Sequence, residues 1–340
     1  MLEKNQKPNI PQIVVVGTGF HRQVSGQADS PLSSWSALLQ KVNEKSRSKI
    51  SHVSSIDSVM QWERMAIDLA YKKSIMASKA EQFLKIKVCK VLNSKSRELI
   101  QSKKYENNIL CESLSNSPIH LISLNFDSLA YEQLKPECKF VVDRNNKILK
   151  KSKKESISVS KTRLLYDRFI CKSTSNLSTV WHPHGHVGRP ESLVLGMRDY
   201  GFLPPSYFYA FNQFKAWENE VAGNLQGNDK YRKLISELAL FDEKSWSSKI
   251  THPADNWVTR FMLYPLTFIG VGLSQVEIGM RWLLVQRSRN FARMSKKGRN
   301  KNMPLVKFFG DKDPRIHGVE FKCSKTKRDY DQLWENALSH

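Results

Sequence analysis

Three short segments of the chain carry residue types that could do chemistry. The first is Gly-Thr-Gly-Phe at 17–20, directly after the β-branched run Ile13–Val16. Such a run ending in glycines predicts a buried parallel strand and a tight turn, and glycines let a backbone approach a pyrophosphate closely. Arg22 stands where the dinucleotide-binding fingerprint has its third glycine. A hydride-transferring dehydrogenase is therefore disfavoured, and a purely structural turn is the alternative.

The second segment is Leu124-Asn-Phe-Asp127, at the end of a core strand expected at 119–125. An asparagine amide in this place can orient a ribose or a water molecule, and Asp127 could fix Asn125. The alternative is a strand-to-helix turn in which such side chains cap backbone amides.

The third segment is His182-Pro-His-Gly-His186. We expect alternating histidines on an extended segment to point to one face. They could form a metal site, since imidazole suits zinc, iron or copper, although no nearby carboxylate or cysteine has matching ligand spacing. They could instead supply one general base beside a glycine that admits substrate. A histidine-rich surface loop is the third interpretation.

Strands and helices alternate over the rest of the chain. Further strands are expected at 179–185, 192–195, 266–272, 305–309 and 319–323, and helices at 33–42, 128–134, 203–241, 275–289 and 330–338. Pro204-Pro205 and Gly223 are expected to interrupt the helix at 203–241. This order predicts an α/β fold, a Rossmann-like parallel sheet flanked by helices, in a single domain over residues 1–340. Ligands of such sheets bind at the carboxyl ends of the strands, where the three polar segments fall.

Two basic regions interrupt this pattern. Residues 57–105 are helix-rich and predict a helical insertion or cap with a solvated basic face, and residues 143–163 predict an exposed basic loop. The chain has 54 Lys and Arg against 32 Asp and Glu, a net charge of +22. This excess favours a polyanionic partner such as nucleic acid or an acidic protein. No helix-turn-helix, zinc-finger or RNA-motif signature occurs, so sequence-specific recognition is not expected.

Composition narrows the class of protein further. With 40% hydrophobic and 25% charged residues, the 340-residue chain is neither collagen-like, coiled-coil nor wholly disordered. Its five cysteines are scattered, without a Cys-x-x-Cys pair, so neither a disulfide framework nor a zinc ribbon is expected and a reducing compartment fits. The N-terminus lacks a signal-peptide pattern, and the apolar stretch 263–273 is too short to span a bilayer. These features predict a cytoplasmic protein without a membrane partner.

The ordered set Gly-Thr-Gly, Leu-Asn-Phe-Asp, His-Gly and Phe-Ile-Gly-Val-Gly-Leu-Ser resembles the sirtuin-like family, in particular the bacterial sirtuin-like domains of antiphage defence systems. The resemblance covers roughly residues 10 to 325. It implies that the first turn covers the pyrophosphate of NAD and the last one lies near the adenosine ribose. The NAD-binding residues that it implies are Gly17, Thr18, Gly19, Phe20, Gly185, Gly270, Gly272 and Ser274.

The resemblance also implies an activity, cleavage of the nicotinamide–ribose bond of NAD with release of nicotinamide. Asn125 would position the attacking water or the ribose hydroxyls, His184 would be the general base, and Asp127 would orient the loop. NAD would be the substrate, and no metal would be needed. We expect such an NAD-cleaving effector to be regulated by a separate sensor subunit, in an oligomer or hetero-complex.

Some residues depart from the family pattern. Phe126 replaces the usual tyrosine, Phe20 and His21 stand where a serine is common, and Gln275 stands where related sequences often have aspartate. The four-cysteine zinc module is absent, which argues against a protein deacetylase. One alternative is a catalytically silent sirtuin-like scaffold that binds nucleotide or nucleic acid. A basic nucleic-acid-binding protein or nuclease ranks lower, because no carboxylate cluster typical of nucleases lies at a strand end.

Overall fold

A computed structural model describes most of the chain. The described residues are 11–46, 57–102, 105, 109–116, 119–132, 138–141, 164–172, 177–244, 255–272, 277–294, 306–309, 320–322 and 337. The predicted basic loop at 143–163, the predicted helix at 330–338 and the site residue Ser274 lie outside them.

The described residues form an α/β fold around one sheet with the strand order β3-β4-β5-β2-β1-β6-β7-β8. The six strands from β5 to β8 in this order are parallel, whereas β4 and β3 are added antiparallel at one edge. The strands are β1 Gln12–Val16, β2 Ile119–Ser123, β3 Cys138–Val141, β4 Arg168–Lys172, β5 Leu177–Trp181, β6 Leu266–Ile269, β7 Val306–Phe309 and β8 Glu320–Lys322. The predicted α/β class with a mostly parallel sheet is confirmed.

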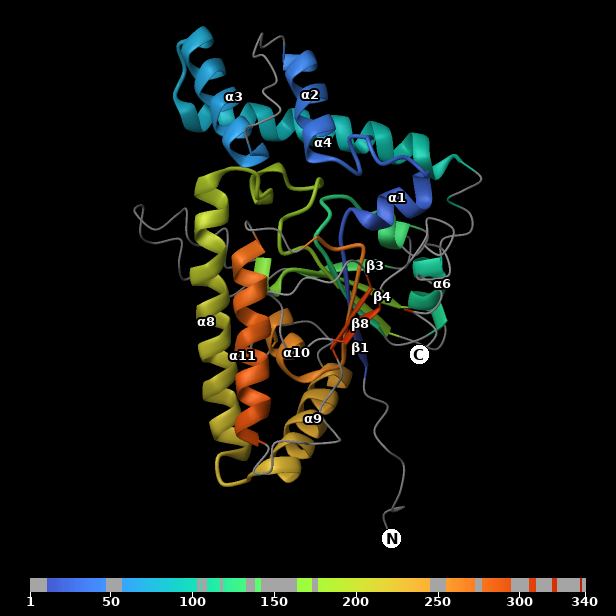
Figure 1. Cartoon of the computed structure of the whole chain (residues 1–340), viewed down its shortest axis with the longest axis vertical. Coiled ribbons are helices and arrows are strands. Elements are labelled where there is room, and N and C mark those ends of the chain that lie inside the picture. The colour runs from blue at the N-terminus through green and yellow to red at the C-terminus, as the bar shows by residue number, and fades with distance from the viewer. Residues whose placement is uncertain are drawn as a thin grey trace.

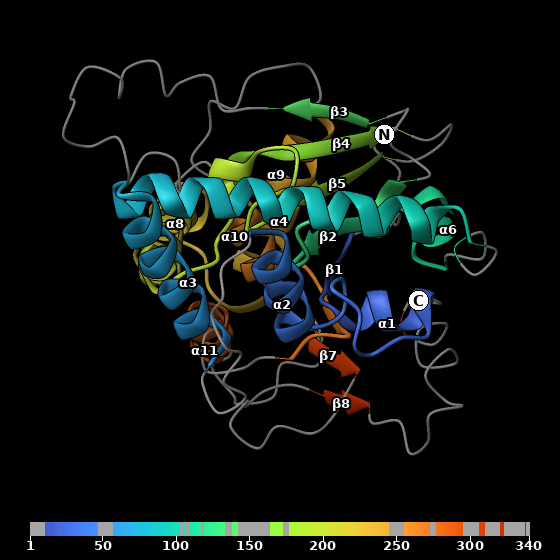
Figure 2. The same ribbon diagram turned by 90° about the horizontal axis from the view of Figure 1, so that it is seen from above.

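Two groups of helices flank the sheet (Figure 1). One group is α1 Gly19–Ser25, α2 Trp35–Ser46, α3 Ser58–Lys73 and α4 Ala77–Ile100, with α6 Ile109–Asn116 beside it. The other is α8 Met197–Ala222, α9 Gly227–Lys244, α10 Trp257–Leu263 and α11 Ile278–Met294. Seen from above, α4 crosses in front of the strands (Figure 2). The helices α3 and α4 occupy the region that the sequence predicts as a helical insertion. None of the helices in the described part of the chain is both long and apolar enough to cross a membrane.

The central strand β1 separates two hydrophobic cores. Ile13 and Val15 pack in the core with α8 to α11, whereas Val14 and Val16 pack in the core with α1 to α4. This division follows from the two-residue period of a strand, which sends successive side chains to opposite faces. All four side chains are fully buried, as expected for a strand covered on both sides.

Two local predictions are wrong. Residues 192–195 form no strand: a short 3-10 turn, Pro190–Ser192, leads into an extended segment that is held by a hydrogen bond from the Val194 amide to the His184 carbonyl, 2.8 Å. Pro204 and Pro205 lie inside α8, which continues to Ala222. The prolines remove two backbone donors, but the helix is retained because its face with Leu203, Tyr207, Ala210 and Phe214 is buried in the core.

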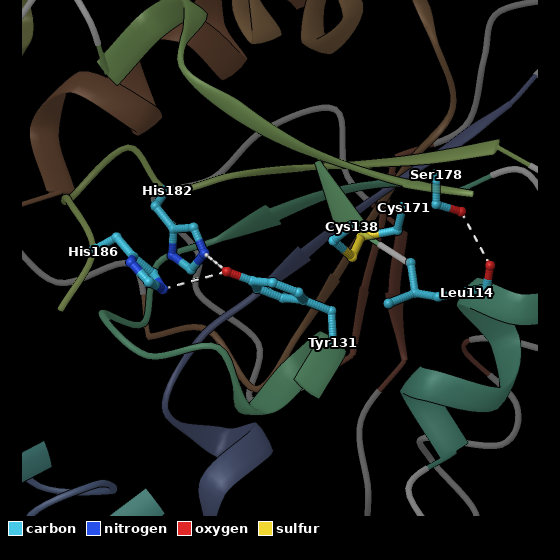
Figure 3. Close-up of a disulfide and its surroundings, with 7 residues drawn as sticks. All are labelled: Leu114, Tyr131, Cys138, Cys171, Ser178, His182 and His186. Carbon is cyan, nitrogen blue, oxygen red and sulfur yellow. Dashed lines mark hydrogen bonds between the residues drawn. A yellow bond between two sulfur atoms is a disulfide. The ribbon is translucent and has the colours of Figure 1, made fainter. Parts of the chain in front are cut away.

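A disulfide joins the two antiparallel edge strands, which corrects the expectation of unpaired cysteines (Figure 3). Cys138 and Cys171 are directly opposite each other in the β3–β4 register, with 4.0 Å between their Cα atoms. The pair is 33 residues apart in sequence, and strand pairing rather than sequence spacing brings it together. The buried Cys89 is free.

A buried ionic network lies under the edge strands on the α9–α10 side. Arg168 of β4 bonds Asp255, 2.9 Å, and Arg260 of α10 pairs with both Asp255 and Asp242. His120 of β2 contacts Asp242, 3.3 Å between Nε2 and Oδ2. Burial alone would raise the pKa of Asp242, but Arg260 and His120 lower it overall. The network thus keeps charged groups inside the core by pairing each with an opposite charge.

Candidate functional site

The glycine turns after β1 and β6 pack directly against each other. The Gly19 amide donates to the Gly270 carbonyl, 2.9 Å, and Gly270 has a φ of +62°. A Cβ atom on Gly17 would lie 2.7 Å from the Gly270 oxygen, and one on Gly270 would lie 2.7 Å from the Gly19 Cα. Glycine is therefore required at these positions by the close approach of two backbones. The structure brings the first and last predicted motifs together at the same edge of the sheet.

Asn125 links the ends of three strands. It follows β2 and is buried, and its Nδ2 donates to the Gly17 carbonyl after β1, 3.0 Å. Its backbone carbonyl accepts from Nδ1 of His182 after β5, 2.8 Å. The side-chain oxygen Oδ1 has no hydrogen-bond partner among the described residues. An unpaired buried acceptor is costly, so this atom is a candidate contact for a ligand.

Asp127 pairs with His21 rather than with the Asn125 amide. Its Oδ2 lies 2.9 Å from Nε2 of His21, and both side chains are buried. Its Oδ1 accepts from the Leu129 amide, 3.0 Å. Burial alone would raise the pKa of Asp127, but the charge and hydrogen bond of His21 and the Leu129 amide lower it. The expectation that Asp127 fixes the Asn125 side chain is therefore wrong, and the carboxylate instead fixes His21 of α1.

A cavity lies between the ends of β1 and β2 and the helices α2 and α4. Its polar wall contains Thr18, His21, Asn125 and Asp127. The remaining wall is mostly apolar and consists of Pro31, Leu32, Ser34, Trp35, Leu38, Leu92, Leu124 and Phe126. Its volume is about 30 Å³, room for about one water molecule, so the cavity must open to admit a larger ligand. Thr18 precedes α1, and its side chain makes no capping hydrogen bond.

The histidine-rich segment is a turn, so its histidines do not share one face. The Gly185 amide donates to the His182 carbonyl, 2.9 Å, and Gly185 has a φ of +89°. His184 lies with Nε2 3.3 Å from Oε2 of Glu277, just before α11, and its ring contacts Tyr200 of α8. His184 is buried and is not among the residues that line the cavity. The structure therefore separates His184 from the group formed by Asn125, Asp127 and His21.

The other two histidines share the hydroxyl of Tyr131 (Figure 3). This oxygen lies 3.2 Å from Nε2 of His182 and 3.3 Å from Nε2 of His186. His182 Nδ1 must carry a proton because it faces the Asn125 carbonyl, and His186 Nδ1 must be bare because it accepts from the Gly188 amide, 3.0 Å. The Tyr131 hydroxyl therefore donates to His182 and accepts from His186. Burial lowers the pKa of His182 to about 4, which keeps it neutral.

The remaining predicted site residues have different surroundings. Phe20 is fully buried in the core with α1 to α4. No atom of the described residues lies within 4 Å of the place where a Gly272 side chain would begin. Sequence reasoning missed His21, Tyr131 and Glu277 as members of the site region. The signal for His21 was present, because it follows the first glycine turn by two residues; the other two depend on tertiary contacts.

Among the described residues, no group of three or more histidine, cysteine, aspartate or glutamate side chains could hold a metal ion. Comparison of the chain with protein-family models, with curated proteins and with solved structures finds no match.

Proposed function

We propose that the chain cleaves the nicotinamide–ribose bond of NAD and releases nicotinamide. The observation that carries the proposal is the buried Oδ1 of Asn125, which has no hydrogen-bond partner among the described residues and belongs to a side chain on the cavity wall. The sirtuin-like order of the motifs supports NAD as the substrate. Trp35 and Phe126 give the same cavity an aromatic wall, and Thr18 adds a hydroxyl without a capping bond. These groups match the planar rings and ribose hydroxyls of a nucleotide, and the cavity of about 30 Å³ must open to admit them.

The reaction needs a positioned water and a proton acceptor. Water adds to the ribose carbon while the bond to nicotinamide breaks, and nicotinamide leaves with the bonding electron pair as a neutral molecule. Asn125 holds the ribose hydroxyls or the water, and a base takes the proton that the water loses. The motif resemblance assigns this base to His184. His21 is the alternative base, because it lies on the cavity wall and is paired with Asp127.

Nicotinamide release measured by chromatography tests this proposal. We expect Asn125→Ala to lower turnover at least about 100-fold, in the range of one lost catalytic group. His184→Ala and His21→Gln identify the base, because only the loss of the true base should abolish turnover in a protein that keeps its fold. Near-normal turnover in Asn125→Ala would contradict the proposal. We propose that the chain acts in a cytoplasmic defence complex with a separate sensor subunit. Because defence effectors are commonly inactive until triggered, the assay is repeated with lysate of phage-challenged host cells.

A second candidate is a silent scaffold that binds nucleotide without cleaving it. The contact of His184 with Glu277 and Tyr200, away from the cavity, favours it. Calorimetric binding of NAD by the purified chain, with no nicotinamide formed under any condition, would support this candidate. Loss of that binding in Asn125→Ala would place the nucleotide in the same cavity.

A further inference from the structure

The helix α8 carries a long uncharged surface. From Tyr200 to Phe214 the sequence contains no Asp, Glu, Lys or Arg, although 25% of the whole chain is charged. The uncharged stretch is not all buried, since Phe208 is 54% and Tyr209 48% exposed. The neighbouring aromatic residues Phe211 and Trp282 pack against the core, whereas Phe208 and Tyr209 are about half exposed. Their exposure therefore calls for another explanation.

The neighbouring helix α11 extends this surface. The two helices lie side by side (Figure 1), and a Cβ atom on Gly279 would be 2.6 Å from the Tyr207 ring. The Trp282 ring lies 5.8 Å from that of Phe208 and 5.4 Å from that of Phe211. Ile278 and Val285, each about one turn from Trp282 along α11, are 62% and 44% exposed. We call the set the α8–α11 face: Phe208, Phe211, Ile278, Trp282 and Val285.

This face has the layout of a helix-binding surface. Ile278, Trp282 and Val285 follow the i, i+4, i+7 spacing of one helix stripe, and Phe208 and Phe211 extend it sideways onto α8. A contiguous exposed apolar patch of this kind marks an interaction site in a soluble protein. The apolar stripe of an amphipathic helix is the element that such a surface commonly buries.

Charge identifies the partner. Every charged residue of α11 is an arginine: Arg281, Arg287, Arg289 and Arg293. Arg287 is buried and bonds the Phe261 and Tyr264 carbonyls, whereas Arg289 and Arg293 are exposed. A second copy of the chain would bring arginine against arginine. We propose that the α8–α11 face binds an amphipathic helix of another protein, whose apolar stripe is flanked by aspartate or glutamate.

Defined peptides test the proposal on the full chain. One labelled helical peptide has leucines at i, i+4, i+7 and i+11 flanked by glutamates, and the second has lysines in place of the glutamates. Binding is measured by fluorescence anisotropy. The double variant Phe208→Gln/Val285→Gln removes the face, and Ile67→Gln/Tyr71→Gln, at exposed apolar residues of α3, is its matched control. Arg289→Glu reverses a charge beside the face, with Arg97→Glu on α4 as its control.

We expect the acidic peptide to bind at least tenfold more tightly than the basic one. Binding of the acidic peptide should be about tenfold weaker, a change of about 1.4 kcal/mol, in Phe208→Gln/Val285→Gln and in Arg289→Glu. Both control variants should bind it as tightly as the wild type. If the control variants weaken peptide binding equally, the peptide is attracted by the basic surface in general, and the proposal is overturned. Absence of binding would overturn it too. Concentration-dependent dimerisation in sedimentation velocity, abolished by Phe208→Gln/Val285→Gln, would assign the face to a second copy instead.

Discussion

The His21 ring and the Asp127 carboxylate are in buried contact, 2.9 Å between Nε2 and Oδ2, and this contact ties the helix after the first strand to the turn after the second. Both residues line the cavity between the strand ends and the helices α2 and α4. The pair thereby fixes one side of the candidate site.

Replacing Asp127 by asparagine should destabilise the protein by about 1–3 kcal/mol, because the buried His21 would lose the carboxylate that it contacts. The Oδ1 acceptor for the Leu129 amide is retained, so the loss of stability reports on the contact with His21. Urea unfolding measures the change. The double variant His21→Gln/Asp127→Asn should recover part of the stability, and an unchanged urea midpoint in Asp127→Asn would contradict this account.

Replacing Gly270 by alanine should cost at least about 2 kcal/mol, since it combines a left-handed backbone with a backbone contact. The new Cβ atom would lie 2.7 Å from the Gly19 Cα. Gly272→Ala is the matched control, because no atom of the described residues lies within 4 Å of its added Cβ atom. Thermal unfolding of the two variants side by side gives the comparison. If the two variants lose the same stability, the packing of the two glycine turns is not the reason that position 270 requires glycine.

Protonation of His182 should lower stability at mildly acidic pH. Burial lowers its pKa from 6.5 to about 4, so the folded form binds this proton less tightly than the unfolded chain. Neutral His182 contributes fully to the free energy of unfolding above pH 6.5. This contribution is lost as the pH falls towards 4, which lowers the free energy of unfolding by up to about 3 kcal/mol. The variant His182→Asn keeps a donor for the Asn125 carbonyl and cannot titrate. Its free energy of unfolding should fall less steeply with pH, and parallel curves would show that His182 is not the titrating group.

Reduction of the Cys138–Cys171 disulfide should lower the stability of the protein by about 3–4 kcal/mol. This estimate follows from the loop of 33 residues that the bond closes. The urea midpoint with and without dithiothreitol measures it. Cys138→Ala/Cys171→Ala should show the reduced midpoint in both conditions, and Cys89→Ser controls for the free cysteine. An insensitive wild-type midpoint would mean that the two thiols do not pair in solution.

The sequence predicted the elements whose cause is local. The alternation of Ile13, Val14, Val15 and Val16 between two cores follows from the strand period alone, and the glycines that end β1 and β6 marked both turns. The α/β class followed from the order of such runs. These features depend on residues that are neighbours along the chain.

The contacts that the sequence did not predict are tertiary. Cys138 and Cys171 pair because two antiparallel strands align them, and His184 contacts Glu277 because α11 begins beside the histidine turn. The helix α8 passes through Pro204 and Pro205 because core burial outweighs the missing backbone donors. The spacing of these residues along the chain does not predict such tertiary contacts.

The hydrogen-bond chain from His186 through Tyr131 to His182 has one direction. Two backbone groups set it, the Gly188 amide at one end and the Asn125 carbonyl at the other. A backbone carbonyl does not take up a proton, so a proton entering at His186 has no exit beyond His182. Three titratable rings lie next to the candidate site, but their hydrogen bonds give a proton no path out of the chain. Their hydrogen bonds tie the turn after β5 to the segment after β2.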